Sequence, residues 1–281
     1  MTAPALTRLP AAPRVTTHPA TFGRLVTGEW VKFRSLRSSW AILALGVVLV
    51  PAFAVSRMTS IAQVPEAAGS ASLVASVYVT SGTALTQLVF AVFGVMAIAG
   101  EYGSGQIRTT LAVTPGRIAA IGAKLLVTVL AAMGASIVAV AISWAASAPW
   151  FAATGMSIDL TNADDLRILA GVPLYLGAIT ALAFGVGLIV RSSAAGIAIV
   201  LGFLLVLENL LGVIPWEPIQ AFAAYLPSSA GSRLLQSDAV GSVITTSNLT
   251  LLSPWAGYGV MVAWVVDILV VAFVLLRRRD A

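Results

Sequence analysis

The sequence predicts an all-α, polytopic membrane protein with six transmembrane helices and an N-terminal interfacial amphipathic helix. Of its 281 residues, 59% are hydrophobic and only 10% are charged, whereas soluble domains usually carry about 25% charged residues. The chain also holds six long apolar segments, and about 20 apolar residues suffice for a helix to cross a bilayer. These observations favour one membrane domain over residues 21–281, preceded by a disordered tail at residues 1–20.

The first predicted element is an amphipathic helix over residues 21–37. Its apolar side chains recur at three- and four-residue intervals, as at Trp30 and Phe33, while Lys32, Arg34 and Arg37 lie mostly off that face. A basic amphipathic helix ahead of a membrane span fits the plane of the lipid headgroups. An ordinary basic flank of the first span is the alternative.

The six predicted spans cover about residues 40–56, 78–99, 121–146, 168–190, 194–213 and 257–276. The first is short, and Pro51 within it can kink a helix. The third and fourth carry small residues at four-residue steps, such as Ala135 and Ala139 in one and Gly177 and Ala181 in the other. Such stripes let helices approach closely in lipid. These spans should therefore pack against protein, either of the same chain or of a second copy.

The connector between the last two spans, residues 214–254, is long and not uniformly polar. Apolar side chains punctuate it, and Pro215, Pro218 and Pro227 interrupt it. We expect short amphipathic helices that dip into the outer leaflet; a folded-over outer loop is the alternative.

The distribution of basic residues predicts the topology. With the N-terminus in the cytoplasm, only Arg57, Arg167 and Arg233 of the 16 lysines and arginines fall outside. This is a strong positive-inside signal, so we expect a multi-pass protein of the plasma membrane with both termini cytoplasmic. The net charge of +5 then reflects topology and contact with membrane lipid. It requires no nucleic acid partner.

The composition excludes several kinds of site. The chain has no cysteine, which rules out disulfides and thiolate metal sites. The single histidine, His18, lies in the N-terminal tail, which excludes a histidine-based metal cluster within the membrane. The sequence contains no catalytic constellation and no nucleotide-binding loop. We therefore expect no metal and no cofactor on this chain.

Two carboxylates fall inside predicted spans, Glu208 in the fifth and Asp267 in the sixth. Because an intramembrane carboxylate is costly and normally faces protein or water, both are candidates for lining a polar pathway or for a proton-linked step. Packing hydrogen bonds are the alternative. The adjacent Asp164 and Asp165 are expected to be solvated in an outer loop.

The segment from Gly100 to Arg117 is too patterned for a plain loop. Glu101 and Tyr102 lie at a membrane boundary, and Gly103 and Gly105 then allow a sharp turn. A short helix along the membrane surface follows, up to Pro115. A rigid element held between two spans can transmit a displacement to both of them. An ordinary loop is the alternative.

Three stretches of the chain stand out by their order and spacing. The first is Gly28–Ser38, which includes Glu29, Trp30 and Lys32 in an E-W-x-K and R-S pattern. The second is Glu101-Tyr102-x-x-Gly105-Gln106-Ile107-Arg108, followed by Pro115 and Lys124, and the third is Tyr225-Leu226-Pro227-Ser228. Together they resemble the permease subunits of the ABC-2 class of ATP-binding cassette transporters, in which threonine often stands where this chain has Gln106.

This resemblance implies an exporter permease that is not itself an enzyme. Separate cytoplasmic ATPase subunits, with ATP and Mg bound to them, would supply the energy, and a second permease copy, identical or related, would complete the membrane unit. Residues 21–37 would form the connecting helix. The segment around Glu101–Thr110 would be the coupling helix, with ATPase-docking residues Glu101, Tyr102, Gly105, Arg108 and Thr109. The family's substrates include drugs, peptides, lipids and polysaccharides.

Two other classes of function remain open from the residues alone. A membrane enzyme using Glu208 or Asp267 would need a metal or a second acid within reach. A proton-driven secondary transporter should show internal hydropathy repeats, and the sequence has no clear halves.

Overall fold

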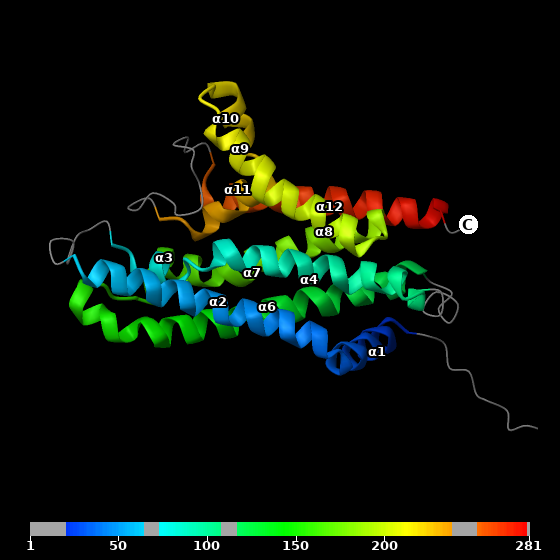
Figure 1. The fold of residues 1–281 in the computed structure, drawn as a ribbon, viewed down its shortest axis with the longest axis horizontal. Coiled ribbons are helices and arrows are strands. Elements are labelled where there is room, and N and C mark those ends of the chain that lie inside the picture. The colour runs from blue at the N-terminus through cyan, green and yellow to red at the C-terminus, as the bar shows by residue number, and fades with distance from the viewer. Residues whose placement is uncertain (1–20, 65–72, 108–116, 238–251, 280–281) are drawn as a thin grey trace, which may run out of the picture.

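The computed structural model describes residues 21–64, 73–107, 117–237 and 252–279 (Figure 1). In these ranges six helical spans are long and apolar enough to cross a membrane: α2 (Arg37–Ala62), α4 (Thr83–Gly103), α6 (Arg117–Thr154), α7 (Ala163–Val190), the continuous run from α8 to α9 (Ser193–Val213) and α12 (Pro254–Arg279). The prediction of an all-α, multi-pass membrane protein is confirmed. The predicted disordered tail, residues 1–20, falls outside the described ranges.

Helix α7 forms the centre of the bundle. It packs against α4, α6 and α12, and 83% of its most apolar stretch is buried within the chain. The stripes of small residues make these close approaches. A Cβ atom on Gly177 would lie 2.8 Å from Cγ of Met133 in α6, and Ala139 of α6 is fully buried. The two stripes therefore pack within the same chain.

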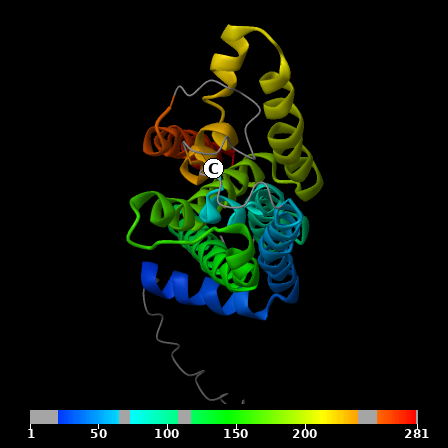
Figure 2. The ribbon, with the colours of Figure 1, turned by 90° about the vertical axis from the view of Figure 1, so that its left-hand side faces the viewer.

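Helix α1 (Phe22–Ser35) runs across the direction of the long helices at one end of the bundle (Figures 1 and 2). Its apolar face packs mainly on α6. Phe33 anchors it, because this ring is buried and lies 5.3 Å from the Trp40 ring and 6.3 Å from the Phe93 ring. The predicted amphipathic helix is thus present, although it ends one residue before Leu36 and α2 starts afresh at Arg37. Its orientation is the one expected for a helix in a headgroup plane.

The first span is longer than predicted. Helix α2 continues through Pro51 without interruption and on past Arg57. The Arg57 guanidinium lies 4.8 Å above the Tyr78 ring, and this cation–π contact gives the charge a partner at the helix end.

The second span begins later than predicted. A short helix, α3 (Ala75–Val79), precedes it, and the chain turns before α4 begins at Thr83. The turn occurs where Gly82 lies directly against the backbone of Val50 in α2, with no room for a side chain. The turn falls on the polar stretch Thr80-Ser81-Gly82-Thr83 within the predicted span, and it places Gly82 against α2.

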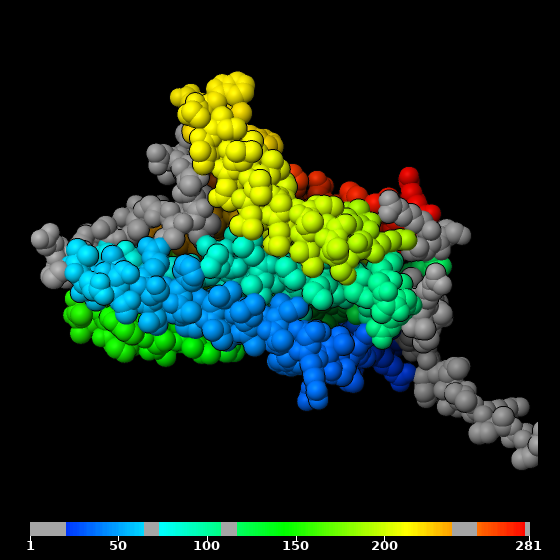
Figure 3. All heavy atoms as spheres, viewed as in Figure 1, coloured from blue at the N-terminus to red at the C-terminus, as the bar shows by residue number. Residues whose placement is uncertain are grey.

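The fifth span changes direction at a π-helical turn, η2 (Gly202–Leu207), between α8 (Ser193–Leu201) and α9 (Glu208–Val213). The predicted short connector helices follow as α10 (Glu217–Ala223), α11 (Pro227–Ser232) and the 3₁₀ turn η3 (Arg233–Leu235). Helices α9 and α10 stand away from the bundle (Figures 1 and 3), and we call them the lateral arm. Helix α11 returns and packs on α12.

Candidate functional site

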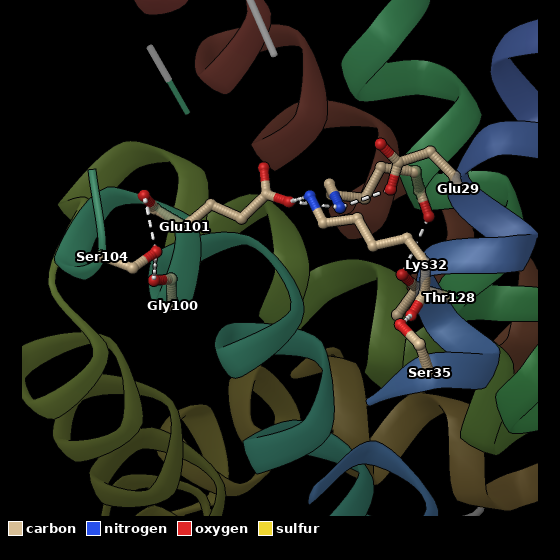
Figure 4. A network of polar contacts seen from close by, with 8 residues as sticks. Glu29, Lys32, Ser35, Gly100, Glu101, Ser104 and Thr128 are labelled. Atoms are coloured by element: carbon tan, nitrogen blue, oxygen red, sulfur yellow. Dashed lines mark hydrogen bonds and ion pairs between the residues drawn. The ribbon is translucent and has the colours of Figure 1, made fainter. Parts of the chain in front are cut away.

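Four side chains of alternating charge join α1, α4 and α6 (Figure 4). Glu29 and Lys32 are one turn apart on α1, Glu101 lies in the last turn of α4, and Lys124 lies near the start of α6. Lys124 Nζ is 2.5 Å from Glu29 Oε2 and 2.8 Å from Glu101 Oε1. Lys32 Nζ also pairs with Glu101 Oε1. We call these four residues the charge cluster.

The charge cluster is largely shielded from solvent. The Glu101 and Lys124 side chains are only 6% and 8% exposed, and those of Glu29 and Lys32 are more open at 13% and 23%. Two glutamates and two lysines balance to zero net charge. Removing one partner of a buried ion pair costs about 3–5 kcal/mol, so the contact of α1 with the ends of α4 and α6 depends on all four charges being present.

Local sequence explains how Glu101 is placed in the cluster. Helix α4 stays helical through Gly103, and Ser104 then closes it, since its backbone N–H donates to the Gly100 carbonyl at 3.1 Å. Gly105 follows with φ of 72°, a left-handed conformation that favours glycine. The predicted turn at Gly105 therefore directs the chain away immediately after Glu101 has reached the lysines.

One acceptor of the cluster is unused among the described residues. Glu101 Oε1 is shared by both lysines, while Glu101 Oε2 is buried without a hydrogen-bond partner in this part of the chain. Beside the cluster, Glu29, Lys32 and Lys124 help to line a cavity of about 30 Å³, which has room for about one or two waters. The site can thus accept a further donor without losing an existing ion pair.

Tyr102 contacts a different part of the bundle from Glu101. The Arg191 guanidinium lies 5.1 Å from the Tyr102 ring centroid. Arg191 ends α7 in a left-handed conformation, with φ of 59°, and its N–H donates to the Gly187 carbonyl at 2.9 Å. The last turn of α4 therefore touches α1 and α6 through Glu101 and the α7–α8 turn through Tyr102.

The structure brings together three of the residues named from sequence, Glu29, Lys32 and Glu101, and stacks Trp30 on Phe33 beside them at 5.6 Å. Arg34 and Arg37 are exposed and lie outside the cluster. The remaining coupling residues, Arg108 and Thr109, fall outside the described ranges.

Sequence reasoning missed two members of this site as functional residues. In the sequence Lys124 stands out only as part of a motif, yet in the structure it is the centre of the charge cluster. Its signal was available, because a lysine inside an apolar span is costly unless it is paired. Arg191 had no comparable signal, since a basic residue at the end of a span is ordinary.

Glu208 belongs to a second buried polar group, which we call the connector cluster. Its carboxylate accepts hydrogen bonds from the backbone N–H groups of Ser228 and Ser229 at 3.1 and 2.9 Å. The Ser228 hydroxyl lies 3.0 Å from the Tyr175 hydroxyl and 3.1 Å from Gln87 Oε1. This network joins α4, α7, α9 and α11, so Glu208 makes packing hydrogen bonds that hold the base of the lateral arm.

The other acids behave differently from Glu208. Asp267 is exposed on α12, and no hydrogen bond or ion pair joins it to Glu208 within the described chain. Asp165 corrects a prediction: it is buried rather than solvated, and it accepts a hydrogen bond from the Ser76 hydroxyl at 2.6 Å. Asp164 is exposed, as predicted. In the described ranges, no group of three or more His, Cys, Asp or Glu side chains could hold a metal ion.

Neither protein-family models nor curated protein sequences give a match to this chain. Its function must therefore be argued from the two polar clusters and the arrangement of the helices around them.

Proposed function

We propose that this chain is the membrane-spanning permease subunit of an ABC-2-type transporter, which moves substrate across the plasma membrane with ATP hydrolysed by a separate subunit. The charge cluster carries the proposal. Glu29 and Lys32 belong to one motif, Glu101 to the second, and Lys124 follows it, and the cluster joins these distant motif positions in one network. Such a meeting point is what a coupling site requires.

The mechanics of the cluster support a coupling role. A cytoplasmic partner pushing on the segment after α4 would move Glu101 and Tyr102 together. Glu101 would carry the displacement to α1 and α6 through the lysines, and Tyr102 would carry it to the end of α7 through Arg191. Because α7 is the central helix, one local push would reach most of the bundle.

Two features outside the cluster support a second permease copy. The lateral arm leaves Leu210, Val213 and Trp216 largely exposed. Asp267 is exposed within a membrane span, where a carboxylate facing lipid is unfavourable. A second copy beside these elements would cover both. Glu208 gives less support to a proton-driven transporter or an intramembrane enzyme, because both of its oxygens already bond the connector.

The decisive experiment is joint purification. The neighbouring reading frames are first searched for a soluble ATPase with a P-loop. The chain is then expressed with such an ATPase, purified through a tag on the chain, and reconstituted in vesicles. We expect a stable complex that hydrolyses ATP, whereas the chain alone does not. Transport by the chain alone under a proton gradient, or failure of the ATPase to bind, would overturn the proposal.

The variant Glu101→Lys tests the coupling role within that complex. It places three ammonium groups around one remaining carboxylate, so α1 and the α4 end should separate. We expect ATP-driven transport to be lost while the chain still reaches the membrane. Transport at the wild-type rate would remove Glu101 from the mechanism.

A further inference from the structure

An apolar groove runs between α1, α2 and α6. Its volume is about 490 Å³, within the range of about 300–1,000 Å³ typical of ligand sites. Trp30 and Trp40 lie at one end, Val47 and Val48 line α2, and Leu130, Gly134 and Val138 line α6. The lining is almost entirely apolar, and the groove is open along its length.

The end of the groove at Trp30 and Trp40 lies beside polar and charged groups, unlike the apolar remainder of its lining. Trp30 and Trp40 are near the elbow between α1 and α2, where the Trp40 Nε1–H donates to the Arg34 carbonyl at 3.3 Å. Arg34 is one turn from Trp30, and Arg37 is one turn from Trp40, so both arginines belong to the neighbourhood of the two indoles. Both guanidiniums are exposed, and neither forms an ion pair with another described residue.

We propose that the groove binds one anionic phospholipid, with an acyl chain against α2 and α6 and the phosphate at Arg34 and Arg37. An acyl chain matches a narrow, apolar slot that follows the direction of the spans. Tryptophans are enriched at the depth where headgroup and chain meet, and two exposed arginines without an ion pair to any described residue are complementary to a phosphate. This proposal rests on the groove alone and is independent of the transport function.

The bound lipid would complete the packing of α1. At the elbow Phe33 contacts Trp30 and Trp40, but both indoles remain partly exposed among the described residues. An acyl chain in the groove would cover them and would add an apolar contact to α1 beside its ion pairs.

Photo-crosslinking tests the proposal directly. The purified full-length chain is placed in phosphatidylcholine nanodiscs containing a trace of phosphatidylglycerol with a diazirine in its acyl chain, and labelled peptides are mapped by mass spectrometry. We expect labels on α2 near Val47 and on α6 near Gly134. At about fivefold per arginine, phosphatidylglycerol should label more than tenfold better than a diazirine phosphatidylcholine, and the double variant R34Q/R37Q should lose that preference.

Matched glycine variants test the groove itself. A side chain at Gly134 would enter open space inside the groove, and one at Gly259 on α12 would enter open space elsewhere on the bundle. Gly134→Leu should therefore reduce groove labelling by about tenfold or more, whereas Gly259→Leu should leave it unchanged. Both variants should elute as the wild type does.

Three results would overturn the inference. Equal labelling by the two lipids would remove the role of the arginines, and unchanged labelling in Gly134→Leu would remove the groove. The third concerns a protein occupant: since the chain lacks cysteine, Gly134→Cys provides a single thiol, and efficient disulfide crosslinking between two copies would show that a second chain covers the groove.

Discussion

Lys124 of α6 and Glu101 of α4 form an ion pair of 2.8 Å in which both side chains are more than nine-tenths buried. The two residues start from helices whose connection runs through residues 104–116, yet each also has a charged partner on α1. The pair is thus the point at which three elements depend on the same two charges.

Neutralising the pair should show strong coupling between its members. Lys124→Met and Glu101→Gln should each cost up to about 3–5 kcal/mol, because each leaves the buried cluster with an unbalanced charge while one ion pair to α1 remains. The double variant should cost less than the two single costs combined, since Glu29 and Lys32, three residues apart on α1, can then pair with each other. Thermal unfolding in detergent measures all four proteins of the cycle.

Simple additivity within about 0.5 kcal/mol would contradict this coupling. The pair Arg57→Gln and Glu101→Gln provides a control cycle. Because Arg57 lies near the far end of α2, the costs of these two substitutions in unfolding free energy should be additive.

Replacing Arg191 with glycine and replacing it with alanine should change the stability of the protein to different extents. Its left-handed φ of 59° costs a residue with a side chain about 1–2 kcal/mol, which glycine avoids. Both substitutions lose the contact with the Tyr102 ring. We therefore expect Arg191→Gly to be more stable than Arg191→Ala by about 1 kcal/mol, measured by thermal unfolding. Equal stability of the two variants would mean that the left-handed cap carries no strain.

Removing the Glu208 carboxylate should loosen the base of the lateral arm. In Glu208→Ala the N–H groups of Ser228 and Ser229 lose their acceptors, and a buried donor left unsatisfied costs about 1–3 kcal/mol. Hydrogen exchange at these two amides should accelerate by roughly tenfold or more, with no change in α1.

Asp267→Asn is the matched control for Glu208→Ala. It also alters an acid within a span, but among the described residues no hydrogen bond or ion pair joins Asp267 to the connector. Faster exchange at Ser228 and Ser229 in this control would show that the effect is not specific to Glu208.

The contact between α4 and α7 should not accommodate even one additional methyl group at Gly94 without a loss of stability. A Cβ atom there would meet the Thr180 carbonyl of α7 directly, and overpacking of this kind costs about 1–3 kcal/mol. Gly100, two turns later in α4, has open space around it, so Gly100→Ala should instead stabilise the helix by about 0.5–1 kcal/mol. Opposite shifts in melting temperature are expected for the two variants, and shifts of the same sign would contradict the packing described for α7.

The general architecture was readable from sequence because hydropathy and span length are local properties. The six apolar segments and the amphipathic α1 follow from composition and spacing alone. What could not be read were interruptions caused by distant residues. At the turn before Thr83, Ser81-Gly82 is itself a local turn signal, but the contact of Gly82 with the backbone of Val50 in α2 is encoded by no local pattern.

The site was only partly readable for the same reason. Glu29, Lys32 and Glu101 belong to motifs that the sequence shows. The lysine that joins them is recognisable as their partner only in the folded structure. Asp165 shows the opposite error, since an acid in a polar loop looks solvated until Ser76 is seen beside it. Pairing between charges 69 and 95 positions apart is a property of the assembled bundle.

Those same separations set an order of events during biosynthesis. Helix α1 leaves the ribosome first, but its partners follow only after α4 and the start of α6 have been made. Until then Glu29 and Lys32 can neutralise each other on the helix surface, and α1 can wait at the headgroups. The docking of α1 on the bundle is therefore a late step. In a chain interrupted before Lys124, α1 would remain exposed and undocked, and this exposed helix would distinguish an unfinished protein from a complete one.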